Sequence, residues 1–152
     1  MAEINLKNNR GTVILDDEIM QFLNKFNLRI AIDKNGYPEV YGKLHHLAIG
    51  RPEKGVHVDH INRNKLDARK SNLRFCTPAQ NSANAGPRKG NYKGVRKNKT
   101  RNGYTYHGGI TLSDKRIHLG VFNSAEDAAY SYDLAAKLVH KEFAYINFSR
   151  WV

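Results

Sequence analysis

Cysteine and long apolar runs are both scarce in this sequence, and each absence excludes a class of protein. Cys76 is the single cysteine among 152 residues, which excludes an intrachain disulfide and a zinc site built on cysteines. No run of about 18 apolar residues occurs, so no membrane span is predicted. The first ten residues lack the apolar core of a signal peptide. We therefore expect a protein of a reducing, cytoplasmic compartment.

Acidic residues are also few. The chain has 14 Asp and Glu against 25 Lys and Arg, which gives a net charge of +11. Between Arg88 and Arg116 the only acid is Asp114. Clustered positive charge favours a polyanionic partner, although charge can also serve solubility alone. The cations lie in a segment with strand character rather than on an amphipathic helix, which favours nucleic acid over a membrane surface.

Residue patterns in the first part of the chain predict small α/β structure. We expect residues 1–10 to lack regular structure. Apolar spacing predicts a strand at 11–15, a helix from Asp16 or Asp17, and two strands at 28–32 and 37–41 joined by a turn at Asn35-Gly36. The expected apolar face of the helix consists of Ile19, Phe22, Leu23 and Phe26. We expect this part to pack behind the candidate site described next.

The middle of the chain predicts a strand, a loop, a second strand and a helix. Alternation predicts a strand at 56–61, a loop follows at 62–67, and residues 72–75 form the second strand. Thr77 suits a helix cap, Pro78 suits the first helical position, and Gln80 can complete a capping box. Polar side chains therefore lie on the first strand and in the first helical turn.

Four of these polar side chains suit hydrolysis of a phosphodiester. The carboxylate of Asp59 and the carboxamide of Asn81 can supply two oxygens to a hard metal ion that keeps several waters. A neutral His60 can take a proton from water. Adjacent strand residues point to opposite faces, so His60 and Asp59 share a site only where the strand twists, bulges or ends. Asn72 can hydrogen-bond either the loop backbone or the imidazole.

The stretch G-V-H-V-D-H-I-N-R-N-K-L-D-A-R-K-S-N-L-R-F-C-T-P-A-Q-N resembles the HNH nuclease motif, in the variant found in phage and intron-borne homing endonucleases. The resemblance covers about residues 44–84 and implies two strands and a helix around one divalent ion. It implies that His60 is the general base, that Asp59 and Asn81 bind Mg²⁺ or Mn²⁺, and that Asn72 supports the catalytic site. It leaves the roles of His45 and Asn84 open.

Beyond a linker-like segment at 82–91, the sequence predicts three strands and one helix. The strands are expected at 92–96, 104–111 and 116–122, and acids after Ser124 suit a helix start. Small residues at helical spacing predict that this helix packs closely on the sheet. We expect His57 to face away from His60, and His107, His118 and His140 to be sheet or packing residues.

Residues 91–148 resemble the plant ethylene-response-factor DNA-binding domain, through N-Y-K-G-V-R-K, Y-H-G-G-I, K-R-I-H-L-G-V-F and A-E-D-A-A-Y-S-Y-D-L-A-A. That family places the exposed face of a three-stranded sheet in the major groove. The plant domains carry Trp at the positions of Tyr106 and His118, so their target sequence is not transferred. The residues that the resemblance implies as DNA contacts, or as their neighbours, are Lys93, Arg96, Lys97, Arg101, Tyr104, Tyr106, Lys115 and Arg116.

Together these patterns predict an α+β protein with a ββα-metal (HNH) nuclease domain, followed by a three-stranded antiparallel sheet packed on one helix. The expected domains are an N-terminal extension at 1–43, the nuclease motif at 44–84, a linker at 85–91 and the DNA-binding domain at 92–149. The expected function is a homing-type endonuclease that acts on double-stranded DNA as a monomer or weak dimer, with nicking as the default and double-strand cleavage left open. The alternatives are a non-catalytic DNA-binding regulator and a less specific phage DNA-processing nuclease.

Overall fold

A computed structural model describes residues 1–7, 10–112 and 114–148 of the chain. Ser149, the last residue of the predicted DNA-binding domain, lies outside these ranges. The chain divides into two compact units, of which the first is Met1–Asn81 and the second begins at Ser82. The division falls within a helix, and the predicted linker at 85–91 belongs to the second unit. No helix in the described part of the chain is long and apolar enough to cross a membrane.

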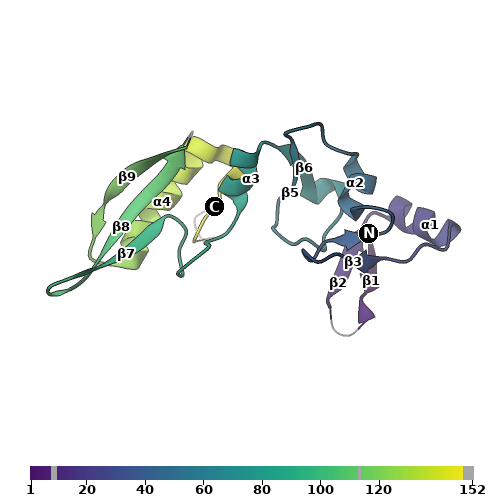
Figure 1. The fold of residues 1–152 in the computed structure, drawn as a ribbon, viewed down its shortest axis with the longest axis horizontal. Helices are drawn as coiled ribbons and strands as arrows, with labels where there is room; N and C mark the ends of the chain where they lie inside the picture. The colour runs from purple at the N-terminus through teal and green to yellow at the C-terminus, as the bar shows by residue number, and fades with distance from the viewer. Residues whose placement is uncertain (8–9, 113, 149–152) are drawn as a thin grey trace. The chain divides into compact units, whose positions relative to one another are not determined.

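The first unit consists of three two-stranded sheets and short helices (Figure 1). Its elements are β1 (Ala2–Asn5), β2 (Thr12–Leu15), α1 (Asp17–Lys25), β3 (Ala31–Ile32), β4 (Pro38–Glu39), α2 (Leu44–Ile49), β5 (His57–His60), the 3₁₀ helix η2 (Lys70–Asn72), β6 (Leu73–Cys76) and α3 (Pro78–Asn84). Residues from β2, α1, α2 and β6 share one apolar core, which includes Leu15, Leu23, Leu44 and Leu73. The N-terminal elements and the candidate nuclease motif are therefore stabilised by the same buried surface.

Two expectations for the N-terminal part are wrong. Residues 1–10 contain a strand, since β1 pairs antiparallel with β2; residues 8 and 9 of that range are not among those described. The helix α1 buries Ile19 and Leu23, whereas Phe22 and Phe26 are 41% and 54% exposed. Only part of the apolar face of this short helix packs against the core, so the aromatic residues remain at the surface.

The strand and helix pattern of the middle segment is present. β5 pairs antiparallel with β6, so that Asp59 lies opposite Arg74 and His60 lies opposite Leu73. The capping box at the start of α3 is formed: the Gln80 side chain accepts from the Thr77 backbone N–H at 2.8 Å, and the Thr77 hydroxyl accepts from the Gln80 N–H at 3.2 Å. These paired bonds fix where the helix begins, and so fix where Asn81 lies.

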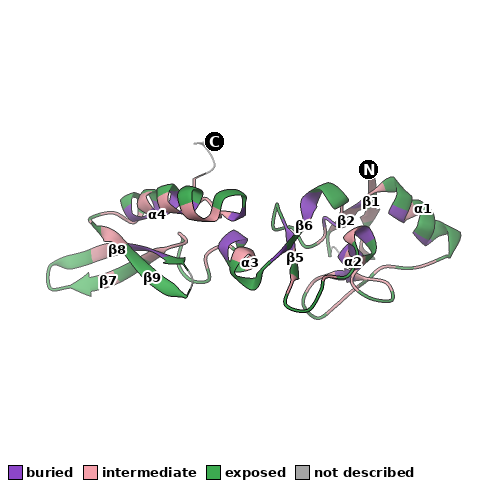
Figure 2. Cartoon of the chain, turned by 90° about the horizontal axis from the view of Figure 1, so that it is seen from above, coloured by how far each residue is buried: buried purple, intermediate pink, exposed green. Residues whose placement is uncertain are grey.

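The second unit is a three-stranded antiparallel sheet with one long helix along one face (Figures 1 and 2). Its elements are β7 (Val95–Thr100), β8 (Gly103–Leu112), β9 (Lys115–Phe122), α4 (Ala125–His140) and the 3₁₀ helix η3 (Lys141–Phe143). The predicted small-residue stripe is the buried face of α4, where Ala128, Ala129 and Ala136 have no exposed surface. Ser124 caps α4 by accepting from the Asp127 backbone N–H at 3.0 Å.

The first strand of this sheet begins later than predicted. β7 spans Val95–Thr100 rather than 92–96. Gly94 has φ +81°, which interrupts an extended strand, and a Cβ at this position would overlap the Tyr132 ring. Asn147 bonds the backbone of Lys93 on both sides and donates to the buried Asp133 of α4. The segment before β7 is therefore held by α4 and the C-terminal residues rather than by the sheet.

Candidate active site and nucleic-acid surface

The candidate site lies where β5 ends. Asp59 and His60 are adjacent, and the β5–β6 register places them on opposite faces of the hairpin, opposite Arg74 and Leu73 respectively. After His60 the chain turns, with the Arg63 N–H donating to the His60 carbonyl at 2.8 Å. The strand therefore ends at the imidazole, and the carboxylate and the imidazole flank this end from two sides.

His60 lies among aromatic side chains of the first unit. It is 6% exposed, and its ring lies 5.3 Å from the ring of His45 and 5.8 Å from that of Tyr37. Burial lowers the pKa of His60; Asp59 and Asp67 oppose this shift, and the charge of Lys65 adds to it. The imidazole is therefore neutral at pH 7, as a proton acceptor must be.

His45, whose role the sequence left open, is a buried neighbour of His60. It is 5% exposed, and burial, followed by the neighbouring His60, lowers its pKa from 6.5 to about 3. A neutral ring at this position adds no positive charge beside His60. His46 also has a lowered pKa, because of burial and the nearby Arg51.

Asp59 forms a buried ion pair across the hairpin. Arg74 contacts the Asp59 Oδ2 through Nε at 2.9 Å and through Nη2 at 2.8 Å. The two side chains are 5% and 16% exposed, respectively. Both nitrogens contact the same carboxylate oxygen and hold it in place, as residues behind metal ligands commonly do.

Asn81 lies on the Asp59 face of the hairpin, next to His57. The side-chain nitrogen of Asn81 is 3.3 Å from His57 Nδ1. His57 lies opposite Cys76 in the register, two residues before Asp59, and so shares its face. The charge of Asp59 contributes to raising the pKa of Cys76, after burial, and the Asn81 backbone bonds that thiol. The structure therefore brings Asp59, Asn81 and His57 to one side, with His57 facing away from His60 as expected.

Asn72 and Asp67 hold the loop that follows His60. The buried Asn72 donates to the Asp67 carbonyl at 2.9 Å and accepts from the Asn62 N–H at 3.0 Å, so it bonds the loop backbone at both ends. Asp67 has no exposed surface and binds Arg69 through both carboxylate oxygens, at 2.8 and 2.6 Å. That pairing holds the pKa of Asp67 below its usual range.

The donor chemistry of the site fits a hard divalent ion. A carboxylate and a carboxamide on one side supply oxygens of the kind that Mg²⁺ and Mn²⁺ prefer, and water can complete the shell. Within the described ranges, no three His, Cys, Asp or Glu side chains cluster as a ligand set.

The predicted DNA contacts of the second unit fall on two faces of its sheet. Gly108 faces α4, where an added Cβ would meet Ser131 and Ala128, and Gly109 faces the other way, against the Arg116 guanidinium. Arg96 lies opposite His107, and Lys97 lies opposite Tyr106. By this alternation Arg96 and Arg116 share the open face, whereas Lys97 and Tyr106 lie on the α4 side.

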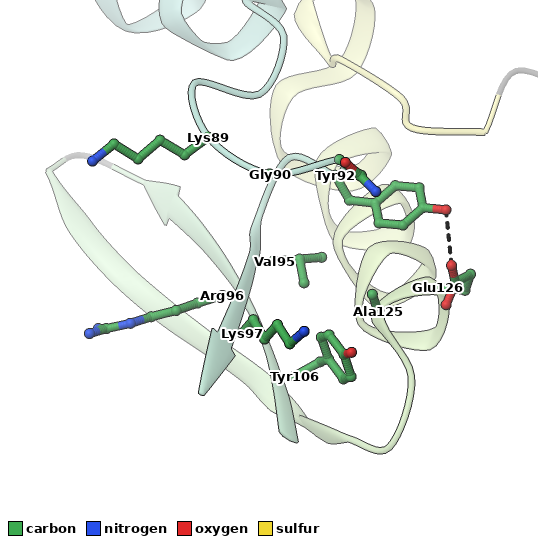
Figure 3. Close-up of a pocket in the computed structure, with 10 residues that line it drawn as sticks. Lys89, Gly90, Tyr92, Val95, Arg96, Lys97, Tyr106, Ala125 and Glu126 are labelled. Carbon is green, nitrogen blue, oxygen red and sulfur yellow. Dashed lines mark hydrogen bonds between the residues drawn. The ribbon is translucent and has the colours of Figure 1, made fainter. Parts of the chain in front are cut away.

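Figure 3 shows the α4 side of β7, where a pocket of about 600 Å³ opens. Lys97, Tyr106 and Val95 face this space, and Arg96 points away from it. The Tyr92 hydroxyl donates to Glu126 at 3.1 Å beside the pocket. The Lys97 ammonium lies 3.7 Å from the Tyr104 ring centroid. The sequence had suggested that Tyr106 contacts DNA together with Arg96 and Arg116. In the structure Tyr106 lies on the α4 side of the sheet, whereas the two arginines lie on the open face.

Lys93 has a different position from the other predicted DNA contacts. Its ammonium donates to three backbone carbonyls at the end of α3, those of Ser82, Ala83 and Ala85, at 2.8, 2.6 and 2.6 Å. Such a bond set satisfies the free carbonyls at a helix C-terminus. We therefore assign Lys93 a structural role and leave it out of the DNA-binding surface. Arg101 and Lys115 are exposed, and the buried Asn84 belongs to the second unit.

Sequence patterns missed several residues around the site. Arg74 could have been found from the strand register, because a cation opposite Asp59 is the expected partner. Tyr37 carries no local signal, since its proximity to His60 depends on how the 31–39 hairpin packs. The buried Asp67 is followed two residues later by Arg69, a spacing that is common in solvated loops.

Comparison with known proteins shows similarity to HNH endonucleases. Residues 44–83 match the family model described as HNH endonuclease. An uncharacterized HNH endonuclease of Acanthamoeba polyphaga mimivirus is 39% identical over 127 residues, which cover 76% of this chain and 65% of that protein. No solved structure matches the chain. Residues 44–83, which contain Asp59, His60, Asn72 and Asn81, are therefore similar to an HNH endonuclease domain.

Proposed function

We propose that this protein is a metal-dependent endonuclease that hydrolyses phosphodiester bonds of double-stranded DNA, with His60 as the general base and Asp59 and Asn81 as metal ligands. The observation that carries the proposal is the placement of a buried, neutral imidazole and an oriented carboxylate on opposite sides of one strand end. The match of this segment to HNH endonucleases supports the same chemistry.

His60 accepts the proton of the attacking water. Its lowered pKa keeps the ring in the basic form at neutral pH. The neighbouring rings of Tyr37 and His45 restrict the orientation of the imidazole. Asn72 bonds the loop that leaves the strand end, so the backbone at His60 keeps one position while the ring takes the proton.

Asp59 and Asn81 would hold the divalent ion, and Arg74 contacts one oxygen of the Asp59 carboxylate. When bound, the ion stabilises negative charge on the phosphate and on the departing oxygen. In an in-line displacement the attacking and departing oxygens lie on opposite sides of the phosphorus. A base on one face of the strand end and ligands on the other match this requirement.

The second unit gives the enzyme its hold on DNA. Arg96 and Arg116 lie on the open face of the sheet, where a guanidinium can bind guanine through two hydrogen bonds. Lys97 and Tyr104, on the other side of β7–β8, suit the phosphate backbone. The resemblance to ethylene-response-factor domains supports groove binding by this sheet, and with it a sequence-directed, homing-type nuclease. With one nuclease motif per chain, a monomer nicks one strand.

A plasmid assay tests this proposal. Supercoiled DNA is incubated with the wild-type protein in Mg²⁺, in Mn²⁺ or in EDTA, with His60→Ala in parallel. We expect nicked circles with either metal, none in EDTA, and at least about a 100-fold loss for His60→Ala. Cleavage at discrete positions supports a homing-type enzyme, whereas dispersed cutting supports the less specific DNA-processing nuclease. DNA binding without any metal-dependent cutting would instead support a non-catalytic DNA-binding regulator.

A further inference from the structure

The hairpin formed by β3 and β4 contributes a wall to the candidate site, although it precedes the matched segment 44–83. Tyr37, just before β4, places its ring 5.8 Å from that of His60 and 5.5 Å from that of His45. Asp33 tightens the turn before Tyr37 by accepting from the backbone N–H groups of Asn35 and Tyr37, at 2.8 and 2.9 Å. The ring is therefore held by its own turn as well as by the two histidines.

Two lysines lie over this same tyrosine ring. Lys43 Nζ is 4.2 Å from the ring centroid and Lys65 Nζ is 4.7 Å from it. Such contacts stabilise an ammonium, and more strongly when it is shielded from water. The charge of Lys43 is balanced, because Asp33 lies 2.8 Å from it. Lys43, first among the causes, lowers the pKa of Asp33 to about 2.

The charge of Lys65 has no such balance. Its ammonium donates to the Asn35 carbonyl at 2.9 Å, and the side chain is exposed. Among the described residues, the ion pairs leave Lys65 without a carboxylate within 4.0 Å. A carbonyl and a ring face orient an ammonium but do not neutralise it, and the group has three N–H donors. Lys65 therefore presents an oriented positive charge beside the general base.

The loop that carries Lys65 is also held in place. Asn62 accepts from the Asn64 N–H at 2.9 Å, and Asn64 in turn accepts from the Leu66 N–H at 3.0 Å. These side-chain turns fix the backbone on both sides of Lys65. An exposed lysine normally loses much side-chain entropy on binding an anion, and a lysine already held by its loop, a carbonyl and a ring loses less.

We infer that the Lys65 ammonium binds a phosphate oxygen of the DNA strand at His60, and that Tyr37 is the positioning residue that holds this ammonium. This role rests on the proposed nuclease function and adds a phosphate contact to it. Charge on the phosphate grows as water attacks, so a fixed cation favours the transition state over the bound substrate. The N-terminal hairpin thereby takes part in catalysis through Tyr37 and Asn35.

A purely structural role for Lys65, tying the loop to the hairpin, makes different predictions. Loss of that tie lowers the unfolding temperature but leaves the salt dependence of DNA affinity unchanged. A phosphate contact instead requires a cation. It also contributes about 0.9 to the slope of log affinity against log salt concentration.

The test compares Lys65→Gln, Lys65→Arg, Tyr37→Leu and Tyr37→Phe in the full chain, with Lys54→Gln as a matched loss of one exposed charge in the same unit. We expect kcat for plasmid nicking to fall 10- to 100-fold in Lys65→Gln, to recover to within about 5-fold in Lys65→Arg, and to stay unchanged in Lys54→Gln. Tyr37→Leu loses an intermediate amount and Tyr37→Phe stays near wild type. Thermal unfolding of each variant checks that the fold is kept.

The salt dependence of DNA affinity, measured in the His60→Ala background, is a second test that needs no cleavage. Adding Lys65→Gln should lower the salt slope by about 0.9. Equal kcat for Lys65→Gln and Lys65→Arg, or an unchanged salt slope, would overturn the role of Lys65. Absence of nicking by the wild-type protein would overturn the proposed function instead, and the salt slope would still decide whether Lys65 contacts phosphate.

Discussion

Individual side chains in this protein take roles that depend on their burial more than on their type. His45 and His60 are buried and neutral, whereas Lys43 and Lys65, which lie over the Tyr37 ring, are half-buried and exposed, respectively. Seven histidines are present in the sequence, of which the motif resemblance selects His60, and the structure adds its burial beside His45 and Tyr37. The response of the site to pH is therefore set by the burial of individual histidines.

Stability should depend on pH through His45. Its pKa falls from 6.5 to about 3 on folding, so the unfolded chain binds a proton below pH 6.5 that the folded chain does not. The free energy of unfolding then falls as pH falls from 6.5 toward 3, by about 1 to 2 kcal/mol between pH 6.5 and 5. Denaturant titrations of the wild type and His45→Gln measure the difference. Parallel pH profiles for the two proteins would contradict the assignment.

The hairpin of β5 and β6 is the element that arranges the site. It places the Asp59–Arg74 pair on one face and His60 on the other. Arg74→Met leaves a buried carboxylate without its guanidinium, and we expect a loss of about 3 to 5 kcal/mol of unfolding free energy. Chemical denaturation measures it.

The matched control is Lys70→Met. Lys70 pairs with Glu18 at 3.1 Å, with side chains 55% and 81% exposed, and exposed pairs contribute about 1 kcal/mol or less. Similar losses for Arg74→Met and Lys70→Met would show that the buried pair contributes no more to the unfolding free energy than the exposed pair. Partial recovery in Asp59→Asn/Arg74→Met would support the uncompensated charge as the cause.

In the second unit, the start of β7 depends on one glycine. Gly94→Ala forces a Cβ into the Tyr132 ring at a backbone φ of +81°, and we expect a loss of at least about 2 kcal/mol. Gly90→Ala is the control, because Gly90 has φ +76° but no atom within 4 Å of the added Cβ; its expected loss is about 1 kcal/mol. Thermal unfolding of both variants separates the steric effect from the backbone effect.

Local signals predicted the elements well where the interactions are themselves local. The Thr77–Gln80 capping box fixed the start of α3, and alternation located β5 and β6. The sequence could not place Tyr37 near His60, because that contact joins residues far apart in the chain. Nor could it predict that Lys93 bonds the carbonyls at the end of α3. In the sequence, a lysine with this structural role looks the same as one that contacts DNA.

At the scale of the whole molecule, a nuclease motif and a basic sheet occur in one chain. The Arg96→Gln/Arg116→Gln pair should weaken DNA binding about 10-fold or more and reduce the salt slope by about 0.9 for each arginine that contacts a phosphate. Where an arginine contacts a base instead, specificity falls and the slope is unchanged. Filter binding over a salt series measures both quantities.

Lys25→Gln/Lys54→Gln removes the same charge from the first unit and serves as the control for that double variant. Neither lysine belongs to the proposed DNA-binding surface, so affinity should change only slightly. A loss of affinity as large as that of the arginine pair would mean that net charge, and not the open face of the sheet, controls binding.

The central claim is that His60 removes a proton from water while Asp59 and Asn81 serve the metal, and chemical rescue tests it most directly. The nicking rate of His60→Ala is measured in Mg²⁺ with increasing free imidazole, alongside Asn81→Ala. We predict that imidazole restores at least a tenfold increase in His60→Ala and none in Asn81→Ala. Nicking by His60→Ala at the wild-type rate, or equal rescue of both variants, would contradict the assignment of His60 as the base.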